Sequence, residues 1–119
     1  MSADDFRYFS IDDFACQETG ENEIEVDLIY RLDDLRGACG FPFVITSGYR
    51  SPNHSIEAGK PNGPGRHASG IAADIAAPSG DQKYLIVKNA MAFGFNGIGV
   101  HKRFIHLDTR EGTPVVWAY

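Results

Sequence analysis

The sequence predicts a single α+β domain in which helices flank a small antiparallel sheet. Its 119 residues fall within the usual size of one compact domain, so we expect one domain over residues 1–119. Helical and strand patterns follow each other along the chain, and the last two strand patterns are separated only by Lys102 and Arg103, as in a tight hairpin. This order favours an α+β domain over a doubly wound parallel sheet.

The composition indicates a folded core and excludes several classes of protein. Hydrophobic residues make up 43% of the chain and charged residues 23%, which is ordinary for a globular domain. The net charge of −5 offers no basic surface, so nucleic acid is not an expected partner. The chain has no apolar run of about 18 residues, and its polar, acidic start does not resemble a secretory signal. We therefore expect no transmembrane segment and no signal peptide.

The two cysteines, Cys16 and Cys39, are expected to be reduced core residues. Two thiols do not make a disulfide framework in a chain of this length. Neither has the close second ligand of a zinc knuckle, so we expect any metal to be bound elsewhere.

The first half of the chain predicts a helix, a strand and a long loop. Apolar residues recur at helical spacing over Glu21–Arg36, and the charged residues between them are expected to form a solvated surface. Gly37 and Gly40 are expected to stop this helix, and a strand is predicted over residues 43–46. Residues 51–65 hold three prolines and three glycines, which predicts a loop.

The second half predicts three strands and one helix. A short buried strand is expected over residues 70–76, and Pro78-Ser79-Gly80-Asp81 offers a turn and a capping residue. A helix over Gln82–Phe93 follows, and the hairpin strands are expected over residues 97–101 and 104–109.

Asp74 is the first residue that indicates chemistry, because it is a lone carboxylate among small apolar residues. If this strand is buried, the carboxylate needs a positive side chain, backbone amides or a metal ion as its partner. His67 precedes it by seven residues, and His106 lies in the apolar strand Phe104-Ile105-His106-Leu107. Two imidazoles and one carboxylate are a common catalytic zinc set, which leaves the fourth position for water.

Three segments together resemble the M15 metallopeptidases, which include D-alanyl-D-alanine carboxypeptidases, dipeptidases and phage cell-wall endopeptidases. Residues 46–51 (TSGYRS) are similar to the SGYRS segment of that family. Residues 66–74 (RHASGIAAD) resemble its H-x2-G-x-A-x-D segment, and residues 104–110 (FIHLDTR) its closing F-[IV]-H-[LV]-D strand. The three motifs occur in the family's order and span most of the chain.

The resemblance implies the fold shared by D,D-peptidases and the hedgehog signalling domain, with Zn²⁺ bound by His67, Asp74 and His106. It also implies that Arg50 lies beside the metal and holds a carboxylate or carbonyl of the substrate, a role that suits a fixed, always-charged guanidinium. The expected partners are peptidoglycan peptides.

One feature of better-studied branches is missing. They place an acid three residues before the last ligand, or a histidine two residues before it, whereas this chain has Arg103 and Phe104 there. A general base must come from elsewhere, and Asp108 is one candidate because residues i and i+2 of a strand share a face. Asp108 could instead orient a ligand histidine. His101, across the hairpin, is the other candidate, or simply an exposed histidine at a strand end.

Four further side chains are weaker candidates. His54 lies in the loop and could close over a substrate, or it could simply be solvated. Tyr49, Trp117 and Tyr119 could line a substrate groove, although packing in the core is the ordinary role of such rings.

The sequence thus predicts a zinc peptidase that hydrolyses an amide in peptidoglycan stem or cross-link peptides. We expect a monomer that acts at the cell wall, either a phage lysin or virion enzyme or a bacterial enzyme held in the cytoplasm before release. Two alternatives stay open: a non-catalytic wall-binding or structural module of the same fold, and a metal-free domain in which Asp74 and the histidines form a buried polar network.

Overall fold

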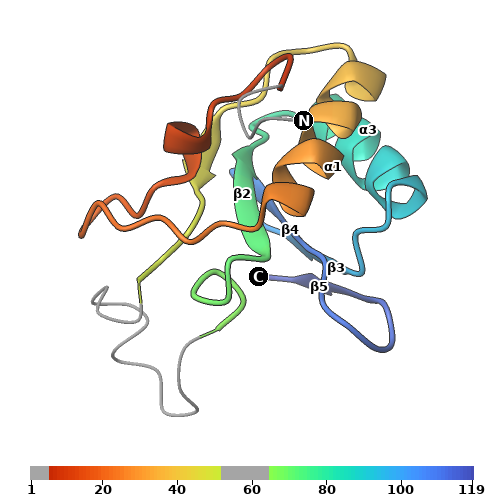
Figure 1. Ribbon diagram of the computed structural model, residues 1–119. Helices are drawn as coiled ribbons and strands as arrows, with labels where there is room; N and C mark the ends of the chain where they lie inside the picture. Colours follow the sequence, from red (N-terminus) through yellow and green to blue (C-terminus); the bar gives the residue numbers. More distant parts are fainter. Residues whose placement is uncertain (1–5, 52–64) are drawn as a thin grey trace.

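The computed structural model describes residues 6–51 and 65–119, and in this part of the chain two helices pack on one side of a five-stranded sheet (Figure 1). The strands are β1 (Ile45–Ser47), β2 (Ala72–Ala76), β3 (Gly97–Val100), β4 (Phe104–Asp108) and β5 (Val115–Ala118). The helices are α1 (Val26–Cys39) and α3 (Gly80–Ala92), and a short 3₁₀ helix, η1 (Ile11–Phe14), precedes them. The α+β class is confirmed.

The sheet is mixed rather than wholly antiparallel. Its strand order is β1-β2-β4-β3-β5, and every neighbouring pair is antiparallel except β3 and β5, which run parallel. The predicted hairpin is confirmed, because β3 pairs with β4 and His101 N donates to the carbonyl of Phe104 (3.0 Å). The prediction of an antiparallel sheet is wrong at β5, a strand that the sequence analysis did not identify.

Side-chain alternation gives the sheet two different faces. Ile75 on β2 and Ile105 and Leu107 on β4 belong to the hydrophobic core, together with buried leucines of α1. The residues between them, Asp74 and His106, are buried polar groups on the opposite face. The helices therefore cover one face, and the other holds the polar residues.

Helix α1 begins at Val26, later than the predicted start at Glu21. The backbone N–H groups of the segment before it bond outside the helix: Ile24 N donates to the Asn22 side chain (3.2 Å) and Glu25 N donates to the carbonyl of Gly70 (2.8 Å). Gly37 lies within the helix instead of ending it. The helix ends before Gly40, whose φ of 78° is the left-handed conformation of a glycine C-cap.

The charged face of α1 contains one exception to the predicted solvated surface. Asp33 is only 4% exposed, and its carboxylate accepts hydrogen bonds from the backbone N–H groups of Arg7 and Tyr8 and from Arg7 Nε. This residue anchors the N-terminal segment on the helix.

Helix α3 is capped as the sequence suggested, since the Ser79 hydroxyl accepts from Gln82 N. Cys16 and Cys39 are buried free thiols, as predicted. Within residues 6–51 and 65–119, no helix has the length and apolar character needed to cross a membrane.

Candidate metal centre

The three residues predicted to bind metal converge on the open face of the sheet. Asp74 and His106 are direct cross-strand partners on β2 and β4, and His67 lies in the turn that leads into β2. Asp74 Oδ1 is 3.3 Å from His67 Nε2 and 3.1 Å from His106 Nδ1. All three side chains are buried, and their nearest ligand atoms lie within 4.8 Å of one another.

The second ring nitrogen of each histidine is held by an acceptor. His67 Nδ1 donates to the carbonyl of Gly48 (2.7 Å), and His106 Nε2 donates to Asp108 Oδ2 (2.7 Å). In a neutral imidazole only one nitrogen carries a proton, so these bonds leave the lone pairs of His67 Nε2 and His106 Nδ1 directed at Asp74. Such an outer hydrogen bond is what orients histidine ligands in metal sites.

The donor set fits a zinc ion. Zinc bonds to nitrogen and oxygen of about 2.0–2.1 Å in tetrahedral geometry place neighbouring ligand atoms about 3.3 Å apart. The separations of 3.3 Å and 3.1 Å around Asp74 Oδ1 agree with this value. His67, Asp74 and His106 therefore form a cluster that could hold a metal ion.

Hydrogen bonding keeps the carboxylates of this cluster charged. Burial raises the pKa of Asp74, but His106 and His67, which donate to this carboxylate when their rings are protonated, outweigh burial and bring the pKa to about 2. Burial likewise raises the pKa of Asp108, yet the bonds from Arg110 and His106 hold that pKa well below its usual range. Burial lowers the pKa of His106, but its interactions with Asp108 and Asp74 raise the pKa by a larger amount, so the net shift is upward.

The cluster opens into a cavity of about 470 Å³. Asp74 is the only carboxylate among the described residues of its wall, which also contains three arginines. This positive wall contrasts with the net charge of −5 of the whole chain. The lining residues are Arg50, Arg66, His67, Asp74, Phe104, His106, Arg110, Trp117 and Tyr119.

Arg50 lies beside the cluster, as the resemblance implied. Its Nη2 is 3.6 Å from Asp74 Oδ2, and its Nε donates to the Ser47 hydroxyl (3.1 Å). Its backbone N donates to the carbonyl of His67 (3.2 Å), which joins the segment after β1 to the turn before β2. The contact with substrate stays a prediction.

Asp108 lies behind His106 and not in the cavity wall. It is fully buried, and Arg110 clasps it with two parallel hydrogen bonds, from Nε (2.9 Å) and Nη2 (2.7 Å). Of its two predicted roles, this arrangement favours orienting His106 over accepting a proton from a substrate.

Two glycines of β3 leave the space that this arrangement needs. A Cβ at Gly97 would collide with the Asp108 carboxylate, and a Cβ at Gly99 would lie 2.7 Å from the Trp117 indole. Gly99 thus lets the indole lie across β3 toward His106, with a ring separation of 5.1 Å.

Tyr49 and His101 are not among the residues that line the cavity. Tyr49 is 4% exposed and packs in the core. His101 stacks on Phe104 (4.2 Å between ring centroids) and meets the edge of Tyr119 (5.4 Å), so it supports two rings of the wall from behind. Both roles proposed from the sequence stay untested, and His54 lies outside the described residues.

Arg66 and Arg110 line the cavity, although neither was expected there from the sequence. The sequence contained a signal for Arg110, because it follows His106 and Asp108 at the two-residue spacing of a strand face, just beyond the end of β4. Trp117 and Tyr119, named only as weak candidates, do line the cavity.

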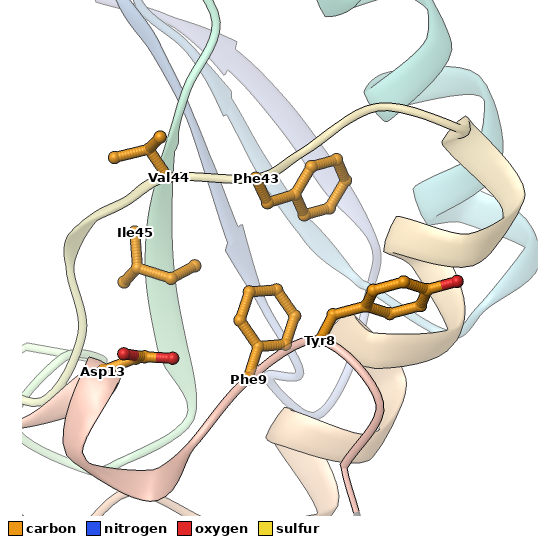
Figure 2. Close-up of a pocket in the computed structure, with 6 residues that line it drawn as sticks. All are labelled: Tyr8, Phe9, Asp13, Phe43, Val44 and Ile45. Atoms are coloured by element: carbon orange, nitrogen blue, oxygen red, sulfur yellow. The ribbon is translucent and has the colours of Figure 1, made fainter.

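A separate cavity, which shares no lining residue with the first, lies between the N-terminal segment and β1 (Figure 2). Its volume is about 300 Å³, and its wall is formed by Tyr8, Phe9, Asp13, Phe43, Val44 and Ile45. Asp13 is its only carboxylate, and that side chain accepts from Ser10 N in the cap of η1. This wall lacks the converging polar groups of the first cavity.

An α+β domain with a buried His/Asp/His cluster facing an open cavity has the form of a metal-dependent hydrolase. Comparison with protein families agrees, because the family model described as peptidase M15 matches residues 7–108. The chain belongs to the peptidase M15 family. No curated protein matches the chain in a sequence comparison.

Proposed function

We propose that the protein is a zinc-dependent peptidase that hydrolyses an amide bond in peptidoglycan stem or cross-link peptides. The observation that carries this proposal is the convergence of His67 Nε2 and His106 Nδ1 on Asp74 Oδ1, with each second ring nitrogen held by an acceptor. Membership of a peptidase family supports the reaction, and the resemblance to cell-wall enzymes of that family supports the substrate.

His67, Asp74 and His106 would hold the zinc ion, which when bound polarises a carbonyl and lowers the pKa of a bound water toward about 7. The chain's own groups bind and orient the peptide. Arg50 is fixed by Ser47 at the cluster's edge and offers donors to a carboxylate or carbonyl oxygen of the substrate. Phe104, Trp117 and Tyr119 supply an aromatic side of the cavity that excludes water from the reacting amide.

One chain supplies all three ligand atoms, so the site needs no second copy, and the protein is proposed to act as a monomer. Action at the cell wall, by a phage or a bacterial enzyme, follows from the proposed substrate and is part of the same proposal.

A non-catalytic zinc module is the second candidate, and one observation favours it. Arg103 and Phe104 stand where related enzymes carry an acid or a histidine, and the described cavity wall has no carboxylate besides Asp74. This candidate predicts bound zinc and peptidoglycan binding without hydrolysis.

Digestion of purified peptidoglycan, with and without a chelator, separates the two candidates when the fragments are identified by mass spectrometry. The peptidase predicts fragments that disappear with the chelator and return when zinc is restored. Arg50→Gln should keep the zinc and lose most turnover. Intact peptidoglycan of several chemotypes, in the presence of zinc-loaded protein, would contradict the peptidase and favour the binding module.

A further inference from the structure

We propose that Arg110 is a second substrate-binding arginine and that the substrate carries one carboxylate for Arg110 and another for Arg50. The inference rests on the proposed function and adds to it the chemical class of the substrate: a peptide with two anionic groups, one on each side of the scissile amide.

The guanidinium of Arg110 is held in one orientation. Its Nε and Nη2 donate to the two oxygens of Asp108, its backbone N also donates to Asp108 Oδ1 (3.1 Å), and its Cζ lies 4.9 Å from the centre of the Trp117 ring. A planar group fixed by a carboxylate fork and an aromatic face loses little freedom when it binds a ligand.

One end of this guanidinium remains available to a ligand. Asp108 takes up Nε and Nη2, and within residues 6–51 and 65–119 no partner exists for Nη1. The side chain is 21% exposed and lines the cavity. The Nη1 group therefore presents two N–H donors at the wall, an arrangement that suits a carboxylate oxygen.

Arg50 and Arg110 lie on opposite sides of the metal cluster. Arg50 follows β1 and contacts Asp74 on the β1 side of the cluster, whereas Arg110 follows β4 and contacts Asp108 of β4 and the Trp117 ring, which lies across β3. Asp74 on β2 and His106 on β4 lie between them in the strand order. A peptide that crosses this face with its amide at the cluster meets one arginine on each side.

The wall is also positively charged overall. Three arginines, Arg50, Arg66 and Arg110, face Asp74 in the wall and Asp108 behind it, so a positive charge remains before any metal is counted. In an acidic protein this local positive surplus favours an anionic substrate.

The test is a matrix of variants and synthetic stem peptides in which each carboxylate is replaced in turn by a carboxamide. The proteins are the zinc-loaded wild type, Arg50→Gln, Arg110→Gln and the control Arg103→Gln, which makes the same charge change at an exposed residue outside the cavity wall. Zinc content is measured for each protein, and Arg110→Lys replaces Arg110→Gln if the latter loses zinc.

We expect Arg110→Gln to raise KM about tenfold or more with little change in kcat, the usual cost of a lost charge-assisted hydrogen bond. This penalty should vanish for one carboxamide peptide, and the Arg50→Gln penalty should vanish for a different one. Arg103→Gln should behave as wild type.

Three results would overturn the inference while leaving the peptidase intact. In the first, Arg110→Gln raises KM equally for all peptides. In the second, the KM increases of Arg110→Gln and Arg50→Gln vanish for the same carboxamide peptide. In the third, Arg110→Gln lowers kcat and leaves KM unchanged. If the wild type cleaves no peptide, the proposed function fails. Dissociation constants of the same proteins and peptides are then measured by calorimetry, and Arg110→Gln should raise the dissociation constant for every peptide except the one whose matching carboxylate is a carboxamide.

Discussion

His106 is the residue on which the candidate centre depends most, because both of its ring nitrogens are engaged at once. Nδ1 faces Asp74 and Nε2 donates to Asp108, whose second oxygen is held by Arg110. We expect Asp108→Asn to weaken zinc binding about 10- to 100-fold, because a neutral carboxamide orients the imidazole less firmly and makes it a poorer ligand.

Zinc titration by calorimetry checks this expectation, with the exposed Asp81→Asn as a control for the lost charge. Equal affinities in wild type and Asp108→Asn would show that Asp108 does not act on the metal through His106.

The raised pKa of His106 predicts how metal binding depends on pH. Burial lowers this pKa, but Asp108 and Asp74 raise it by more, so the protonated ring persists to a higher pH than in a free histidine. A protonated ring cannot bind zinc, so affinity should fall as the pH falls through this raised pKa. Asp74, with a pKa of about 2, stays charged throughout. Zinc titrations from pH 8 to pH 5 measure the slope, and a flat profile would contradict the assignment.

Individual residues could be predicted from the sequence best where they belong to a recognisable motif. The spacing of His67, Asp74 and His106 was a weak signal alone, and the resemblance supplied the grouping that the structure then placed within one cluster. Burial of Asp33 could not be predicted, because its partners on the N-terminal segment lie 25 and 26 residues away.

Among the elements, β3 holds the site open through its lack of side chains. We expect Gly99→Ala to destabilise the protein by about 1–3 kcal/mol, because the new methyl group would displace the Trp117 indole. Trp117 is the only tryptophan, so its fluorescence reports the displacement directly. Gly80→Ala is the control, since a Cβ there meets nothing within 4 Å. An unchanged spectrum in Gly99→Ala would show that the close approach is not required.

Helix α1 provides a second prediction, about the N-terminal segment. Asp33→Ala removes the acceptor of two backbone N–H groups and of Arg7 Nε, and should cost about 1–3 kcal/mol of unfolding free energy. Asp34→Ala, one position along and exposed, should change it by less than about 0.5 kcal/mol. Urea unfolding measures both, and equal effects would mean that Asp33 does not anchor the segment.

The elements differ in how well local sequence predicts them. The hairpin of β3 and β4 and the cap of α3 follow from neighbouring residues, so they were predicted close to their true bounds. The start of α1 was displaced because its preceding residues bond to Asn22 and Gly70 instead. Strand β5 was missed because its parallel pairing with β3 is a non-local contact without a turn signal.

At the scale of the whole molecule, one face of the sheet forms the hydrophobic core and the other carries the candidate metal centre. Leucines and isoleucines of β2, β4 and α1 form the core on one face, which leaves the alternate positions of the same strands free for polar groups on the other. The metal cluster is therefore built on rigid strands, and both arginines that flank it are fixed by neighbours. Because only the folded chain brings His67, Asp74 and His106 together, we expect zinc to raise the melting temperature and a chelator to reverse the rise.

Calorimetric titration of the metal-depleted protein with zinc shows whether His67, Asp74 and His106 bind the metal. Three proteins are compared: the wild type, His106→Ala, and His101→Ala, which removes a histidine outside the cavity wall. We expect one zinc ion per chain in the wild type and in His101→Ala, and no comparable binding in His106→Ala. No zinc binding in the wild type, or equal binding in His106→Ala, would contradict it.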